Sequence, residues 1–177
     1  MSKYAAFISY RHGGIDEQVA IQIHKEIERY RLPKKIAREK GIKTLGKLFR
    51  DAEELRAASN LSEIIREAIR ESEWLIVLCT RRYQESVWCM EEIEYFIELR
   101  GRERVIVVLI EGEPNESFPK ILTEIEKDGK MVHIEPLAVD VRGESDKEIV
   151  KNVKTEKFRF LAQMLDVDYD DLRQRQR

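Results

Sequence analysis

The chain has 177 residues, of which 42% are hydrophobic and 37% charged, a length typical of one domain with its own core. Its 32 lysines and arginines and 34 aspartates and glutamates leave a net charge of −2, which excludes a protein held by its overall charge on nucleic acid or on an anionic bilayer. The longest apolar runs, residues 74–79 and 105–110, are much shorter than the roughly 18 residues that span a membrane. The start has no signal-peptide pattern, and two cysteines and three scattered histidines predict neither a disulfide framework nor a metal site. We therefore expect a cytoplasmic protein.

Short apolar runs, which indicate strands, alternate with segments whose apolar residues have helical spacing. The predicted strands are residues 4–10, 47–50, 74–79, 105–110 and 131–137. Helical spacing begins near Asp16, Asn60 marks the start of a second helix, and a third runs from Ser86 to Gly101. A last helix contains residues 158–165, and the polar segment 166–177 predicts a tail or the start of a linker to another module.

Five strands, each followed by a helix or a helix-like connection, predict an α/β fold. We expect a flavodoxin-like five-stranded parallel sheet with helices on both faces. Ligands bind such sheets beyond the carboxyl ends of the strands, where the strand order reverses. Functional residues are therefore expected at residues 9–14, 51–60 and 80–92. No glycine-rich phosphate loop and no Gly-x-Ser-x-Gly motif occurs in the sequence.

Three motifs in these regions resemble the signatures of one family. They are Phe7-Ile8-Ser9-Tyr10-Arg11-His12 at the end of the first strand, Leu48-Phe49-Arg50-Asp51 with Glu54-Leu55 at the second, and Ser86-Val87-Trp88-Cys89-Met90-Glu91-Glu92 at the start of the third helix. In this order, and on these elements, they resemble the TIR (Toll/interleukin-1 receptor) domain of the bacterial type. The resemblance covers about residues 4–165, so we expect a TIR domain at residues 1–165.

The resemblance implies an activity. Many bacterial and plant TIR domains cleave NAD+ between nicotinamide and ribose, which gives nicotinamide and either ADP-ribose or a cyclic isomer. The family's catalytic glutamate stands four residues after the tryptophan of the third motif, which here is Glu92. Helical geometry supports the choice, because Glu91 points almost opposite the apolar stripe while Glu92 lies at its border. The competing interpretation is a glutamate placed early in a helix by the helix dipole.

One carboxylate is sufficient for this chemistry. The leaving nicotinamide already carries a positive charge in NAD+, so its departure as a neutral base needs no proton and no paired acid. Positive charge then develops on the ribose, where a fixed carboxylate stabilises it.

The resemblance also implies a set of substrate-binding residues. Trp74 stands where the family often has an aromatic ring near nicotinamide, and Arg11 can pair with a phosphate. Simpler interpretations remain open, with Trp74 and Trp88 as core residues and with Ser86 and Asp51 as caps of a helix and a turn. The implied substrate-binding set is Ser9, Tyr10, Arg11, His12, Asp51, Trp74, Ser86 and Trp88, with NAD+ as substrate and with no cofactor or metal.

Two functional hypotheses follow from the resemblance. The first is an NAD+ glycohydrolase, with or without ADP-ribosyl cyclase activity, that acts in bacterial defence or signalling and is activated by self-assembly. The second is a non-catalytic interaction module that acts through homotypic TIR–TIR contacts. In both, the resemblance places self-association in the loop of residues 52–59, after the second strand.

Overall fold

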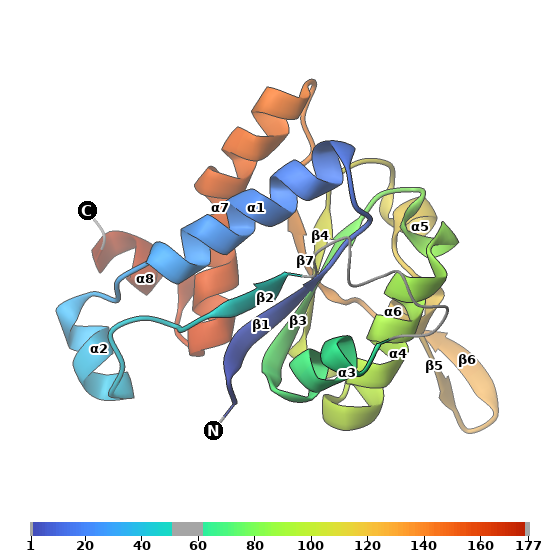
Figure 1. Ribbon diagram of the computed structural model, residues 1–177, viewed down its shortest axis with the longest axis horizontal. Coiled ribbons are helices and arrows are strands. Elements are labelled where there is room, and N and C mark those ends of the chain that lie inside the picture. The colour runs from blue at the N-terminus through green and yellow to red at the C-terminus, as the bar shows by residue number, and fades with distance from the viewer. Residues whose placement is uncertain (1, 51–61, 176–177) are drawn as a thin grey trace.

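The computed structural model describes residues 2–50 and 62–175 of the chain (Figure 1). Within these residues, five parallel strands form the central sheet in the order β2-β1-β3-β4-β7. The strands are β1 (Tyr4–Ser9), β2 (Leu48–Arg50), β3 (Ser72–Cys79), β4 (Val105–Leu109) and β7 (Leu137–Asp140). The order reverses between β1 and β3, as in flavodoxin-like sheets, so the predicted fold class is confirmed.

Helices cover both faces of the sheet. On one face lie α1 (Gly14–Arg29) and α7 (Asp146–Leu165), and on the other lie α3 (Glu63–Arg70) and α4 (Val87–Arg100) (Figure 1). Alternate residues of β1 divide between the two cores, since Ile8 packs on the α1 face and Phe7 on the α4 face. The smaller elements are α2 (Lys34–Lys40), η2 (Tyr83–Glu85), η3 (Arg102–Arg104), α5 (Pro114–Ser117) and α6 (Lys120–Thr123).

Capping residues set the bounds of the helices on the α4 face. The Ser86 hydroxyl caps α4 by accepting a hydrogen bond from the Cys89 N–H (3.2 Å), and Gly101 ends this helix, both as predicted. The cap of α3 is Ser62, two residues later than the predicted Asn60, which lies outside the described residues.

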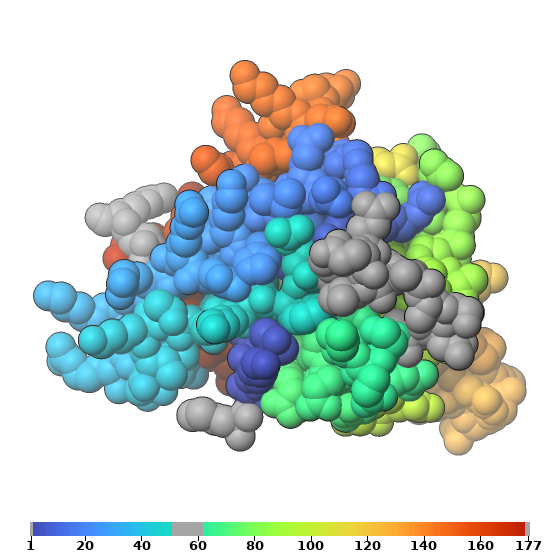
Figure 2. All heavy atoms as spheres, in the orientation of Figure 1, coloured from blue at the N-terminus to red at the C-terminus, as the bar shows by residue number. Residues whose placement is uncertain are grey.

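The predicted fifth strand, residues 131–137, is wrong. Its first part is β6 (Lys130–His133), which pairs antiparallel with β5 (Glu124–Lys127) in a separate hairpin that stands out at the edge of the molecule (Figures 1 and 2). The fifth strand of the sheet is β7, which begins after Pro136. Asp128 and Gly129, both with positive φ, form the hairpin turn.

The segment predicted to be a polar tail contains a further helix. Tyr169–Arg175 forms α8, and Leu172 is buried against the core beside α7. Among the described residues, no helix combines the length and the apolar character needed to cross a membrane.

Candidate active site

A buried carboxylate lies between the carboxyl end of β1 and helix α4. Glu92 projects inward from α4 and is 0% exposed. Its Oε1 accepts a hydrogen bond from the Ser9 hydroxyl of β1 (2.7 Å), and the Tyr83 hydroxyl of η2 lies 2.6 Å from the Ser9 hydroxyl. Ser9 and Tyr83 are also fully buried. Three elements thus bring three buried polar side chains into one hydrogen-bonded chain.

The three hydrogen-bonded side chains are embedded in the apolar cluster between the sheet and α4, which includes Cys79, Cys89 and Ile93. Burial raises the pKa of Tyr83 well above its usual range, and nearby Cys89 and Glu92 add to the shift. A carboxylate in such surroundings is costly unless donors satisfy it. Titratable groups buried at this cost are more frequent at functional sites than elsewhere.

The direction of Glu92 follows from the helix that carries it. Glu92 is buried, whereas Glu91 is half-buried and Glu94 and Glu98 are exposed, so Glu92 lies nearer the core than Glu91, as helical geometry predicted, but deeper than the predicted border of the apolar stripe. Because α4 begins at Val87, Glu92 lies beyond the first turn, which holds no acidic residue. The helix dipole acts mainly within that turn and does not account for a glutamate at this position.

A pocket of about 590 Å³ opens at the carboxyl ends of β1, β3 and β4. The loop between β1 and α1 contributes Arg11 and His12, and the first turn of α1 contributes Asp16. Thr80, Arg81, Arg82 and Glu111 follow β3 and β4 along its other side. Asp16 is only 8% exposed, and burial raises its pKa to about 6 although Arg11 opposes the shift. Glu92 is not among the described residues that line this pocket.

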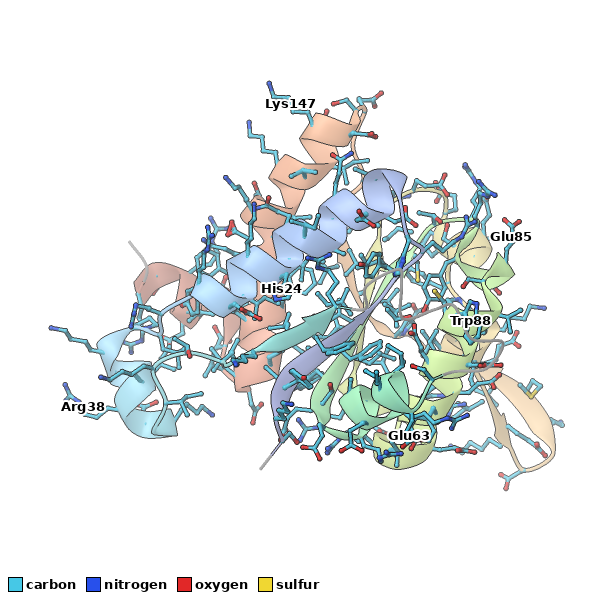
Figure 3. All side chains as sticks on the ribbon, in the orientation of Figure 1. His24, Arg38, Glu63, Glu85, Trp88 and Lys147 are labelled. Atoms are coloured by element: carbon cyan, nitrogen blue, oxygen red, sulfur yellow. The ribbon has the colours of Figure 1, made fainter. Side chains whose placement is uncertain are left out.

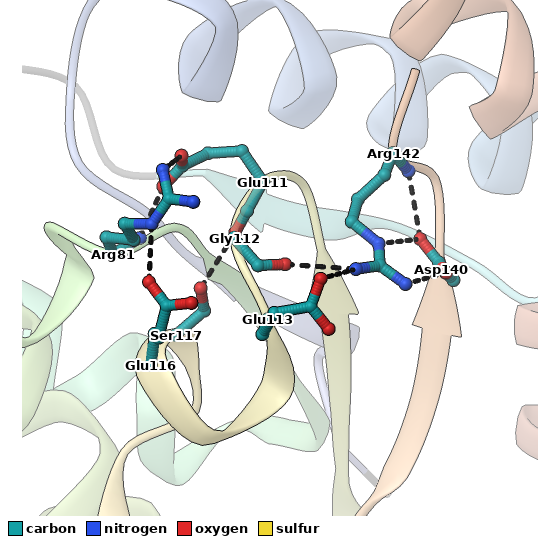
Figure 4. Close-up of polar contacts among 8 residues, drawn as sticks. All are labelled: Arg81, Glu111, Gly112, Glu113, Glu116, Ser117, Asp140 and Arg142. Atoms are coloured by element: carbon teal, nitrogen blue, oxygen red, sulfur yellow. Dashed lines mark hydrogen bonds and ion pairs between the residues drawn. The ribbon is translucent and has the colours of Figure 1, made fainter. Parts of the chain in front are cut away.

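Ion pairs tie together the loops beyond β3, β4 and β7 (Figure 4). Arg81, after β3, pairs with Glu111 (2.8 Å) and Glu116 (2.6 Å), and Arg142, after β7, pairs with Asp140 (2.8 Å) and Glu113 (3.3 Å). The arginines lower the pKa of Glu116 and that of Asp140. One wall of the pocket is therefore fixed by contacts between separate loops.

Comparison with known families decides the classification. The family model of the TIR domain matches residues 6–149, most of the chain. The chain belongs to the TIR family.

Two curated relatives share this domain. NAD(+) hydrolase ApTIR of Actinoplanes sp. is 28% identical over 111 residues, which are 63% of this chain and 14% of that protein. TMV resistance protein N of Nicotiana glutinosa is 28% identical over 131 residues, which are 70% of this chain and 10% of that protein. The chain therefore spans only a small part of the length of either relative.

Solved structures give weaker matches. The TIR domains of the activated Roq1 resistosome that recognises the effector XopQ are 25% identical, with a TM-score of 0.44 and coverage of 63% of this chain and 60% of theirs. A diflavin flavoprotein from Nostoc sp. also has a TM-score of 0.44, at 10% identity, and the match covers 99% of this chain and 97% of that one. The classification rests on the family match.

The TIR motif residues at the end of β1 and directly after it do not share one location. Ser9 belongs to the hydrogen-bonded chain at Glu92, whereas Arg11 and His12 line the pocket. Tyr10 is 1% exposed in the core on the α1 face, where its ring lies 4.8 Å from that of His12. Successive strand residues point to opposite faces, so Ser9 and Tyr10 cannot both face Glu92.

The structure does not bring Trp74 to Glu92. Trp74 lies near the start of β3, opposite Ala6, whereas Ser9 lies opposite Val77 three residues further along. Its ring packs in the core on the α1 face, and the Arg104 guanidinium lies 5.0 Å from the ring centre. Trp74 is therefore a core residue on the opposite face of the sheet.

The remaining residues of the predicted set have mixed positions. Ser86 is the cap of α4, and Trp88, one turn before Glu92, packs half-buried against the apolar cluster of that face (Figure 3). Asp51 and the loop 52–59 lie outside the described residues. Within the described residues, no group of three or more His, Cys, Asp and Glu side chains is placed to hold a metal ion.

Two buried groups, Tyr83 and Asp16, are not among the site residues predicted from the sequence. Tyr83 is the one aromatic residue in the otherwise polar stretch 80–86, a signal that its side chain is buried. Asp16 has no comparable signal, because an acidic residue in the first turn of a helix is common for electrostatic reasons alone.

Proposed function

We propose that this TIR domain cleaves NAD+ at the bond between nicotinamide and ribose, with Glu92 as the catalytic carboxylate. The observation that carries the proposal is the position of Glu92, a carboxylate fixed by a hydroxyl chain in an apolar cluster and beyond the reach of the helix dipole. The relationship to an NAD(+) hydrolase from Actinoplanes supports the same substrate.

The proposed reaction balances without a cofactor. The C1′–N bond breaks, nicotinamide leaves as a neutral base with the bonding electrons, and positive charge develops on the ribose. Glu92 stabilises this charge. Water then adds to C1′ and releases a proton, which gives ADP-ribose. If the adenine of the same molecule adds instead, the product is a cyclic isomer, so the exclusion of water selects between them.

Other described residues suit the rest of the substrate. Arg11 and His12 line the pocket at the end of β1 and offer cationic and hydrogen-bonding groups to the diphosphate. Trp88, one turn before Glu92, offers a ring for the cationic nicotinamide. We include these three residues in the proposal as substrate contacts.

The burial of Glu92 adds a requirement. Because the carboxylate is 0% exposed, ribose reaches it only in a rearranged conformation or assembly. We therefore propose that self-association, through residues 52–59, activates the enzyme and that the activity serves bacterial defence or signalling. Activity per molecule is then expected to rise with protein concentration, and constant specific activity over a wide range would contradict this.

Nicotinamide release tests the proposal. The purified chain is incubated with NAD+ at several protein concentrations and under crowding, and nicotinamide, ADP-ribose and cyclic products are separated by chromatography. We expect Glu92→Gln to lower turnover by about 10²–10³-fold, as loss of a preorganised charge does. Glu91→Gln, its neighbour on α4, is the matched control and should retain activity. Equal release by wild type and Glu92→Gln would refute the proposal.

A further inference from the structure

The hydrogen bonds at Glu92 have a direction. The Ser9 hydroxyl donates its single proton to Glu92 Oε1 (2.7 Å), so it can only accept from Tyr83. The Tyr83 hydroxyl, 2.6 Å away, is therefore the donor in this contact, and the Cys89 carbonyl is its more distant second acceptor, at 3.5 Å. The raised pKa of Tyr83 keeps that proton in place at neutral pH. Two O–H groups in series thus point toward the carboxylate.

We propose that Ser9 and Tyr83 are positioning residues, whose hydroxyl chain holds Glu92 ionised and oriented, and that Ser9 acts through Glu92 rather than by contact with NAD+. The catalytic meaning of this inference rests on the proposed function. The effect of the hydroxyl chain on the charge of Glu92 does not rest on the proposed function, because it concerns the ionisation of one carboxyl group. It assigns a role to Tyr83, which lies outside the three family motifs recognised in the sequence.

Burial explains why the carboxylate needs these donors. Transfer out of water disfavours the charged form of a carboxyl group, and hydrogen bonds donated to the charged form oppose that effect. Among the described residues, Cys79 on β3 and Cys89 on α4 are the other ionisable groups that act on Tyr83. Burial, with smaller contributions from nearby Cys89 and from the charge of Asp16 on α1, raises the pKa of Cys79 well above its usual range, so this thiol stays neutral. The hydroxyl chain therefore favours ionised Glu92.

Backbone pairing and backbone hydrogen bonds fix the positions of Ser9 and Tyr83. Ser9 is in register with Val77 in the parallel pair of β1 and β3. The Tyr83 N–H donates to the Thr80 carbonyl (3.1 Å), and the Tyr83 carbonyl accepts from the N–H of Ser86, the cap of α4 (3.1 Å). The tyrosine is thus tied to the end of β3 and to the start of the helix that carries Glu92.

Two variants remove the donors one at a time. Ser9→Ala removes the hydroxyl that contacts Glu92, whereas Tyr83→Phe removes only the second donor and keeps the buried ring. NMR of glutamate labelled with ¹³C at the carboxyl carbon gives the pKa of Glu92 directly, with its signal identified by its loss in Glu92→Gln. We expect this pKa to rise by about one pH unit or more in Ser9→Ala and by less in Tyr83→Phe.

Kinetics give the second readout. Ionised Glu92 is needed for turnover, so protonation of Glu92 lowers kcat as the pH falls. This decrease is the acid limb of the pH profile. In Ser9→Ala this acid limb should move to higher pH, and kcat above it should fall about 10–100-fold, while KM changes little. Tyr83→Phe should lower kcat by only about 2–10-fold, since it loses a hydrogen bond between neutral groups. Ser9→Cys keeps a weaker donor and should lie between wild type and Ser9→Ala.

Two matched variants control for the loss of a buried or half-buried hydroxyl elsewhere. Ser72 is fully buried at the other end of β3, and its hydroxyl donates to the Ala68 carbonyl (2.6 Å). Tyr95 is on α4, and its hydroxyl accepts from Arg70 (2.8 Å). Ser72→Ala and Tyr95→Phe should change neither the pKa of Glu92 nor the acid limb.

Two results would overturn the inference. In one, Glu92 titrates identically in wild type and Ser9→Ala. In the other, Ser9→Ala raises KM with kcat and its acid limb unchanged, as expected for a substrate contact. If wild type and Glu92→Gln release nicotinamide equally, the proposed function fails, and the NMR titration still decides whether the hydroxyl chain holds the charge of Glu92.

Discussion

Asp16→Asn should stabilise the protein at neutral pH. Asp16 is 8% exposed, and burial raises its pKa from 3.8 to about 6. Because the pKa is higher in the folded state, the unfolded chain ionises first and stability falls as pH rises through this range. This pKa difference between the folded and unfolded states lowers the free energy of unfolding by about 3 kcal/mol at pH 7 and by about half of that at pH 5. Asparagine removes this cost. Because Asp16 lines a pocket, we expect a gain of about 1–3 kcal/mol.

Urea unfolding at matched ionic strength measures this gain. Asp16→Asn and wild type are compared at pH 7.5 and pH 4.5, with the fluorescence of Trp74 and Trp88 as the signal. The gain should be large at pH 7.5 and mostly lost at pH 4.5. Asp146→Asn, an exposed acid in the first turn of α7, is the matched control and should instead lose about 0.3–1 kcal/mol. A gain for Asp16→Asn that is equal at both pH values would refute the reasoning.

Three further predictions concern the framework. Gly112→Ala should cost at least about 1 kcal/mol more than Gly129→Ala by urea unfolding, because both have positive φ but only at Gly112 would a Cβ atom collide with Ser117. Leu172→Ala should cost about 2–5 kcal/mol if α8 packs as observed, and an unchanged midpoint would show that α8 is not part of the folded domain. Ser62→Ala should cost about 1 kcal/mol through loss of the α3 cap, and no loss would mean that another group caps this helix.

The sequence predicted most of the sheet because buried parallel strands are continuous apolar runs. The prediction of the fifth strand failed because a strand of an exposed hairpin can have the same apolar run as a buried strand of the sheet. Met131 and Val132 are apolar but exposed, at 64% and 39%, whereas β7 contributes only one buried residue, Val139. The Asp128–Gly129 turn is a hairpin signal that would have separated the two.

For the site, the sequence predicted directions along one element but not distances between elements. Helical geometry alone placed Glu92 at the border of the apolar stripe and Glu91 away from it. Reading a motif as one contiguous site failed at Ser9 and Tyr10, because a strand sends neighbours to opposite faces. The prediction for Trp74 failed because this residue lies near the amino end of β3, away from the carboxyl ends where Ser9 lies, and faces the α1 side of the sheet. The contact of Tyr83 with Ser9 joins residues 74 positions apart, and no local pattern encodes it.

Two buried carboxylates near the carboxyl end of β1 lower the stability of the fold unless donors satisfy them. Among the described residues, Asp16 and Glu92 are the buried acids, and they come from helices on opposite faces beside the end of β1. Glu92→Gln keeps an oxygen that can accept from Ser9 and removes the charge. It should therefore leave the free energy of unfolding unchanged or raise it by up to about 2 kcal/mol at pH 7, while turnover is lost. Urea unfolding beside the nicotinamide assay measures both effects. A loss of stability above about 1 kcal/mol would mean that the carboxylate supports the fold, and the loss of turnover would then no longer identify Glu92 as the catalytic group.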